Sequence, residues 1–350
     1  MFRVHLFNSQ NATQTFIADI SAICSVDDLT FYLNDVDTIS VEIDADAWLE
    51  YCQQSGVDPL SPIQPYTSEI KIKYNGQYLP AAFEIKRSSR SLKKDKRTIN
   101  LNGMSTLSKL EDRLITKTYS SVDPTTMVRD MITISQAKTG GDFGITFADT
   151  YTTGVPSDRT YERYDIKQAI MNLSDDISGG FDFYFDHDWS LHTMSKRGSL
   201  KSLDLTYGGE LSNVIEMDIP YDASSLSNAV YIVGEGIGSP IVSNPNTDTT
   251  SRAEYGLREK ALSFPSIKNT DWLDVKSKTE VRDRKDIYDL PTVSVAQEVL
   301  DINDVFVGDT VNIQSSSAIA PYSQLKRIRR LSISLDNNFH AVYKLELMDD

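Results

Sequence analysis

Residues 68–87 constrain the fold more than any other part of the chain, because they have the pattern of a β-hairpin. Asn75 and Gly76 supply the two positive-φ positions that a type I′ turn requires. On the strand before this turn, Lys71 and Lys73 alternate with isoleucines, which predicts one solvated face and one buried face. Similar alternation occurs in the segments RVHLF and TISVEID. The sequence therefore predicts strands through most of its first hundred residues.

The whole chain indicates a mostly β fold, with two β-rich regions flanking a small α/β domain. We expect the first β domain at 1–104, the α/β insert at 105–210 and the second β domain at 211–350, with a helix near 270–286. The insert is expected to hold helices because apolar residues recur at helical spacing in YDIKQAIMNLSDDI. No repeat with a period of 20–50 residues is detectable.

Local signals predict several shorter elements. Asp27 and Asp28 indicate the turn of a hairpin within residues 20–33. The segment STLSKLEDRL is expected to form an N-capped helix. VFVGDTVNIQ is expected to form a strand interrupted by a tight turn at Gly308, and the polar residues 238–252 a loop.

The charge of the chain is negative and unevenly distributed. The net charge of −15 gives a surface that repels nucleic acid and anionic membranes, which disfavours DNA binding by charge neutralisation. Residues 1–85 hold twelve acidic and three basic residues, whereas residues 86–97 hold seven basic residues and one acidic residue. Such a basic run is either the solvated tip of a hairpin or a loop that docks on an acidic neighbour, for example the 1–85 region of another subunit.

The segment LKRIRR, residues 325–330, is a second basic stretch. Alternation would place Lys326 with Ile328 on one side of a strand and two arginines on the other. The strand either faces solvent, or its arginines pair with acids of a neighbouring subunit, where bidentate geometry gives specificity. The possible subunit-interface residues from both stretches are Lys86, Arg87, Arg90, Lys93, Lys94, Arg327 and Arg329.

Patterns that imitate catalytic or ligand sites are weak in this sequence. His187 and His192 lie near two aspartates, but we expect them around the exposed tip of a hairpin rather than in a metal site. Gly234, Gly236 and Gly238 imitate a dinucleotide loop without the helix that this motif requires. The chain has no GxSxG elbow, Walker loop or HExxH motif. We therefore expect no catalytic residue, no cofactor and no metal, and a protein that is not an enzyme.

Cys24 and Cys52 are too few for a disulfide scaffold and do not form a CxxC pair, which fits folding in a reducing cytoplasm. The first ten residues lack the apolar core of a signal peptide. The chain also has no apolar run of 18 residues. These features predict a soluble protein without a membrane-spanning segment, made and assembled inside the cell.

The order of β domain, α/β insert and β domain resembles that of bacteriophage tail hub proteins. These are the baseplate hub of contractile tails, the N-terminal hub of siphophage tail-tip proteins and the hub module of type VI secretion spike proteins. The similar phrases, in chain order, are INLNGMSTLSKLEDRL, SSLSNAVYIVGEG, SRAEYGLREKALSFPSI, VFVGDTVNI and RIRRLSISLDNNFHAVYKLEL. Together they extend over nearly the whole chain.

The resemblance implies a homotrimer in a virion, at the tail tip or baseplate. It also implies that the domains at 1–104 and 211–350 are two tube-like β-barrel domains, which would let three chains form a pseudo-sixfold ring. This ring would join a tail tube or distal tail protein to a central spike or fibre protein. Its channel would carry a tape-measure protein or DNA in non-specific passage, and the excess of acid would keep DNA from adhering. The chain stops at Asp350, so we expect any piercing or receptor-binding part on another protein.

Two other functions stay open at this point. A receptor- or carbohydrate-binding tail-tip protein would expose aromatic platforms such as Trp48, Trp189 or Trp272, although core packing is the expected role of these side chains. A cell-wall hydrolase would need a pair of carboxylates in an apolar setting. Asp175 and Asp176 are instead interpreted as the polar end of a helix.

Overall fold

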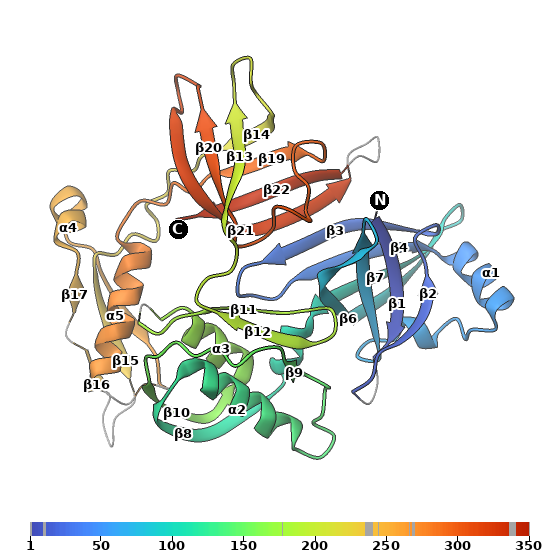
Figure 1. Ribbon diagram of the computed structural model, residues 1–350, viewed down its shortest axis with the longest axis horizontal. Helices are drawn as coiled ribbons and strands as arrows, with labels where there is room; N and C mark the ends of the chain where they lie inside the picture. Colours follow the sequence, from blue (N-terminus) through green and yellow to red (C-terminus); the bar gives the residue numbers. More distant parts are fainter. Residues whose placement is uncertain are drawn as a thin grey trace.

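The computed structural model describes residues 2–9, 12–176, 178–234, 241–243, 245–265, 267, 270–335 and 341–349. Figure 1 shows the elements in chain order. The N-terminal strands and helix are β1 (Phe2–Asn8), β2 (Thr15–Asp19), β3 (Cys24–Tyr32), β4 (Thr38–Asp44), α1 (Ala45–Ser55), β5 (Ser68–Tyr74), β6 (Gln77–Leu92) and β7 (Arg97–Ser105). The C-terminal strands are β13 (Leu200–Tyr207), β14 (Val214–Asp218), β19 (Thr292–Ala296), β20 (Thr310–Ser315), β21 (Tyr322–Leu335) and β22 (Ala341–Met348).

These two sets of strands form one sheet of thirteen strands. Its main path runs β14-β19-β22-β21-β3-β4-β7-β6-β5-β1-β2, and β20 pairs with β21 and β13 beside this path. One hydrophobic core lies against the strands of both sets and includes Phe31, Trp48 and Tyr343. The expectation of a mostly β fold is therefore confirmed.

The sheet contains the same five-stranded arrangement twice. In the first β unit the pairing order is β3-β4-β7-β6-β5, and in the second β unit it is β14-β19-β22-β21-β20. All of these pairs are antiparallel, and the strands of each unit follow one another in the same chain order. The two outer parts of the chain thus share one topology without a detectable sequence repeat.

The longest strand of each unit repeats a finer feature as well. In β6 the register shifts between Ile85 and Arg87, and in β21 it shifts between Ile328 and Arg330. Just before each shift, the carbonyl oxygen of the isoleucine accepts a backbone hydrogen bond from the segment that precedes β5 or β20. Because β-bulges bend a strand at a defined residue, the two shifts mark Arg87 and Arg330 as equivalent positions.

The insert contains two small sheets covered by helices. Its elements are β8 (Leu114–Val122), α2 (Pro124–Gln136), β9 (Thr146–Phe147), β10 (Ser157–Asp165), α3 (Ile166–Ser174), β11 (Asp182–Phe185) and β12 (Ser190–Met194). Asp123 and Asp165 cap α2 and α3 by accepting backbone N–H bonds in the first turn. The apolar faces of both helices enter a second core that is separate from the core of the large sheet.

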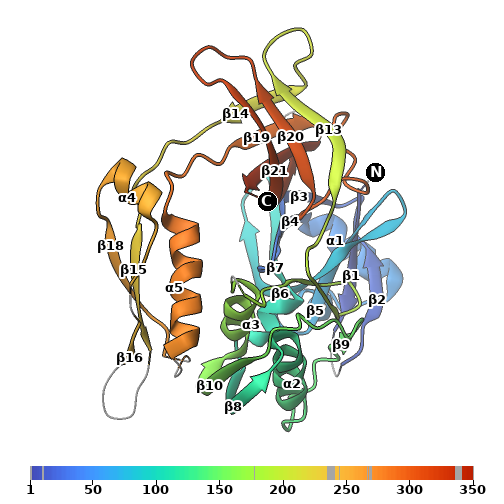
Figure 2. The same cartoon turned by 60° about the vertical axis from the view of Figure 1, so that its left-hand side comes forward.

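A small module lies between β14 and β19 in the chain. It consists of β15 (Ala229–Gly234), β16 (Ile241–Val242), β17 (Asn246–Thr247), α4 (Thr249–Tyr255), β18 (Glu259–Ser263) and α5 (Thr270–Arg284). Figure 2 shows α5 lying against β15, and these elements form a third core around Ile232 and Leu273. The helix expected near 270–286 is therefore present.

Four local expectations are wrong in whole or in part. β3 runs through Asp27, which occupies a register shift rather than a turn. STLSKLEDRL forms only a short 3-10 helix, Thr106–Leu110. All five residues of this helix are buried between the sheet and the insert, so tertiary packing overrides the local preference for an N-capped α-helix. The tight turn expected at Gly308 is present, with φ 97°, but the strand expected before it is not, because β20 begins only at Thr310. In addition, α4 forms within the expected polar loop, with Asp248 as its cap.

The close approach of β4, β6 and β7 gives a stability test. A Cβ added at Gly103 would lie 2.9 Å from both Ile39 Cγ2 and Phe83 Cβ. We expect Gly103→Ala to lower the free energy of unfolding by about 1–3 kcal/mol, because overpacking shifts the neighbouring strands. Asn102→Ala, one residue away in β7, is the control and should change it little. Urea unfolding measures both, and equal midpoints for the two variants would contradict this account of the β4–β7 contact.

Candidate assembly surface

The basic run at residues 86–97 forms the end of the β6–β7 hairpin. The strands close on each other at the tip, where Lys93 N–H donates to Lys96 O at 3.1 Å. Two cations at the base of the tip are already paired with nearby acids. Lys96 Nζ lies 2.6 Å from Glu42 Oε1, and Arg97 Nε lies 3.1 Å from Asp46 Oδ2. The hairpin is thus fixed beside α1 by its own ion pairs.

Lys86 also has its partners within the chain. Its Nζ lies 2.5 Å from Glu84 Oε2 and 4.7 Å from the centre of the Tyr66 ring. Four other cations of the run, Arg87, Arg90, Lys93 and Lys94, are exposed. Over the described part of the chain, none of these four has a carboxylate within ion-pair distance. They form a cationic surface that is available to another molecule.

The backbone beside this surface is also unpaired. β5 pairs with β6 only as far as Glu84, whereas β7 follows β6 to Leu92. Within the described ranges, no strand pairs with the other edge of β6 from Arg87 to Leu92. An open strand edge offers a row of N–H and C=O groups to a partner strand. This edge and the four free cations make the surface basic and capable of backbone pairing.

An acidic strand edge lies in the second β unit. β14 pairs with β19 on one side, and β13 meets only its beginning, where Asn213 N–H donates to Thr206 O at 3.0 Å. Glu216 and Asp218 of β14 are exposed, and no cation of the described residues pairs with them. The sequence reasoning missed this strand edge because its two acids are unremarkable in a chain of net charge −15.

The two arginines singled out in LKRIRR have different environments. Arg329 is exposed at the register shift of β21. Arg327 is buried, and its guanidinium donates to Asp182, to Gly308 O at 2.9 Å and to Arg197 O at 2.8 Å. The expectation that Arg327 faces a neighbouring subunit is therefore wrong, because its donors are used inside the chain.

Arg327 belongs to a buried ionic junction where the insert meets the two β units. Asp182 of β11 accepts from Arg327 of β21 and from Asn34 Nδ2 of the β3–β4 loop at 2.8 Å. Burial raises the pKa of Asp37 to about 7, a shift that the Tyr32 N–H and the nearby Arg197 guanidinium oppose. The junction depends on residues far apart in sequence, so no local pattern could have predicted it.

A second buried polar contact joins the insert to the first β unit. Glu69 of β5 is fully buried and accepts from Lys109 Nζ at 2.7 Å and from Trp189 Nε1 at 2.8 Å. Burial raises the pKa of Glu69, and the Lys109 charge opposes the rise. Lys71 is also buried, and its Nζ lies 3.1 Å from Asp188 Oδ1. The expectation that this face of β5 is solvated is therefore wrong. The insert covers that face.

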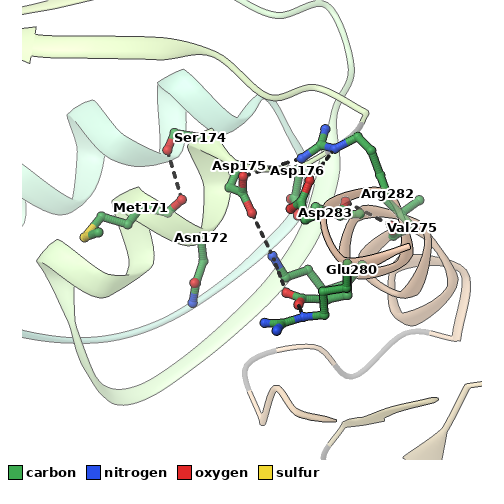
Figure 3. Close-up of polar contacts among 12 residues, drawn as sticks. Met171, Asn172, Ser174, Asp175, Asp176, Val275, Glu280, Arg282 and Asp283 are labelled. Atoms are coloured by element: carbon green, nitrogen blue, oxygen red, sulfur yellow. Dashed lines mark hydrogen bonds and ion pairs between the residues drawn. The ribbon is translucent and has the colours of Figure 1, made fainter. Parts of the chain in front are cut away.

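The small module meets the insert mainly through opposite charges (Figure 3). Asp175, at the end of α3, lies 3.4 Å from Lys276 Nζ and 3.6 Å from an Arg282 nitrogen of α5. The neighbouring Asp176 is buried and pairs with Arg159 at 2.5 Å. These two acids were expected only to end a helix. Asp175 also connects the insert to the small module, whereas Asp176 pairs within the insert.

The residues of the rejected metal site and of the aromatic platforms have ordinary structural roles. His192 Nε2 lies 3.0 Å from Asp186 Oδ2, and no group of three potential metal ligands occurs among the described residues. Trp48 and Trp189 are buried and Trp272 is half-buried. Gly236 and Gly238 lie outside the described residues. So do Asn337 and Asn338, where the sequence predicts the turn of a final hairpin. No helix in the described ranges is long and apolar enough to cross a membrane.

Arg327 and Arg329 provide a matched test of the ionic junction. We expect Arg327→Ala to lower the free energy of unfolding by about 3–5 kcal/mol, because it removes one partner of a buried ion pair. Arg329→Ala, two residues away and exposed, should leave it nearly unchanged. Thermal or urea unfolding measures both variants. An equal loss in the two would show that the junction does not stabilise the fold.

Asp37 gives a pH-dependent prediction. Its folded-state pKa of about 7 lies above the ordinary value of 3.8, so the folded chain favours the protonated carboxyl. The contribution of this carboxyl to the free energy of unfolding is largest below about pH 4, and it is lost as the pH rises through the folded-state pKa of about 7. Asp37→Asn should therefore gain stability relative to the wild type across this range. Unfolding free energies measured from pH 4 to 8 check this, and a constant difference would contradict the assignment.

Comparison with known proteins adds evidence on the fold. No protein-family model and no curated protein matches the sequence. Among solved structures, a tail protein from Neisseria meningitidis MC58 has a TM-score of 0.67 and 13% identity, covering 100% of this chain and 96% of its own. The 43 kDa tail protein of prophage MuSo2 from Shewanella oneidensis has a TM-score of 0.65 and 12% identity, covering 99% and 98% of the chains.

A third similar structure is the prophage tail protein gp18 from Listeria monocytogenes EGD-e, with a TM-score of 0.55 and 14% identity over 98% of this chain and 94% of its own. All three are tail proteins. At this level of identity the likeness concerns the fold. In each comparison it extends over nearly the full length of both chains. The chain has the fold of phage tail proteins, as the resemblance of its sequence implied.

Proposed function

We propose that this chain is a structural hub of a phage tail tip or baseplate, and that it acts without catalysis. The observation that carries the proposal is the repeated five-stranded β unit, with the same strand order and a matching register shift in each copy. Two like units in one chain allow three chains to present six similar units around an axis. Such a homotrimer can contact a sixfold ring on one side and a threefold structure on the other.

The partners that fit this role are a tail tube or distal tail protein, a central spike or fibre protein and a tape-measure protein. DNA would pass through the central channel without specific contacts. The net charge of −15 supports this part of the proposal, because an acidic wall repels the phosphate backbone. The full-length likeness to three tail proteins supports the location in the virion tail.

The exposed basic residues are the candidates for contacts between subunits. Arg87, Arg90, Lys93, Lys94 and Arg329 are exposed. Lys86 is half-buried beside Glu84 and would lie at the margin of such a contact. The alternative role in binding a receptor or carbohydrate is not favoured by the aromatic residues, because two of the three candidates, Trp48 and Trp189, are buried and Trp272 is half-buried.

The oligomeric state tests this function. We expect mass photometry and sedimentation equilibrium of the full chain to give a species of about 118 kDa, three times the chain mass of 39.3 kDa. The trimer should persist in moderate salt and form at micromolar concentration. A chain that stays monomeric at high concentration, and also with its tail partners, would refute the hub.

A further inference from the structure

Among the described residues, one strand pairing joins the two β units, and this pairing has a defined form. β21 pairs with β20 along its first half, up to Arg327. Beyond the register shift, the same edge of β21 pairs antiparallel with β3, from Arg330 with Tyr32 to Ile333 with Leu29. Thr30 Oγ1 and Ser332 Oγ also lie 2.9 Å apart across this contact. A β unit thus receives the edge strand of the next unit just after its bulge.

The first β unit has the equivalent edge, but nothing occupies it in the single chain. By topology and register shift, β6 corresponds to β21 and Arg87 corresponds to Arg330. The residues that correspond to Arg330–Ile333 are therefore 87–90. As described above, no strand within the described ranges pairs with this edge. The site that accepts β3 in the second unit is open in the first.

The second β unit has the equivalent edge strand, which is also open. β14 corresponds to β3, since each pairs with the strand that follows it in the unit. β3 has a second partner, β21, whereas β14 has no strand ladder on its outer edge among the described residues. One chain therefore holds both halves of a second contact of the same kind. The two halves belong to opposite ends of the pair of β units.

The charges of the two open edges are complementary. The β6 edge carries Arg87 and Arg90, both exposed and free of acidic partners. The β14 edge carries Glu216 and Asp218, both exposed and free of basic partners. Opposite charges on paired strands favour association, and they disfavour pairing of either edge with itself. The arrangement selects head-to-tail contact between copies.

We propose that β14 of one copy pairs antiparallel with residues 87–90 of β6 in the next copy. The contact repeats between chains the β3–β21 pairing seen within the chain, so that all β units in the ring meet in similar ways. It rests on the proposed hub function and specifies the surface through which the subunits join. Two observations indicate that a second copy of this chain pairs with the open β6 edge: the equivalent β3–β21 pairing within the chain, and the opposite charges of the β6 and β14 edges.

Charge reversal tests the proposal in the full-length chain. Arg87→Glu with Arg90→Glu should weaken trimer formation by at least about tenfold, because the edges then repel each other. Glu216→Arg with Asp218→Arg should do the same. The chain with all four substitutions should recover the trimer, since each edge again meets an opposite charge. Arg258→Glu with Lys260→Glu, an equal charge change beside and on β18 of the small module, is the control and should remain trimeric.

Sedimentation equilibrium gives the association constants, and circular dichroism establishes that each variant is folded. A second measurement does not depend on any variant: backbone amides of residues 87–90 and 214–218 should exchange hydrogen more slowly in the trimer than in diluted monomer. If the wild type is trimeric but the reversals leave the trimer intact and these amides exchange equally fast, the pairing is wrong while the hub stands. If the wild type never forms a trimer, the hub itself is wrong.

Discussion

The antiparallel pairing of β3 with β21 is the interaction on which the rest of the structure depends. It joins two five-stranded units into a single sheet, although they lie at opposite ends of the chain. Hydrogen bonds between these strands also bring both apolar faces to one continuous core. β21 is already paired with β22 along its other edge, and β3 joins it only beyond the bulge. The pairing therefore fixes the position of the first β unit relative to the second.

Buried charges join the insert to this double unit, together with Val36 and Met104 of the first unit, which pack into the core of the insert. Asp182 and Arg327 connect it to the second unit, and Glu69 with Lys109 connects it to the first. Buried ion pairs of this kind add little net stability, but removing one partner leaves an uncompensated charge. The positions of the insert and the two units are therefore coupled through a few side chains.

Local patterns were sufficient for much of the fold. Asn75 and Gly76 predicted the β5–β6 turn because a type I′ turn has a specific requirement for positive φ, and both residues have it. Helix α5 was equally recognisable from the segment 270–286. Local patterns failed where tertiary contacts decide the outcome, as at Lys71, which the insert covers, and at Asp27, which a bulge accommodates within β3.

The candidate surface was only partly predictable for the same reason. The basic run at 86–97 could be recognised from composition, but a sequence cannot show that β5 stops at Glu84 and leaves the β6 edge open. The repeated β unit was likewise hidden, because the two copies share strand order rather than residues. The decisive measurement is a cryo-EM reconstruction of the assembled chain. We expect a threefold ring in which six β units surround a central channel. Units that lie away from the axis, or an assembly without threefold symmetry, would contradict the hub function.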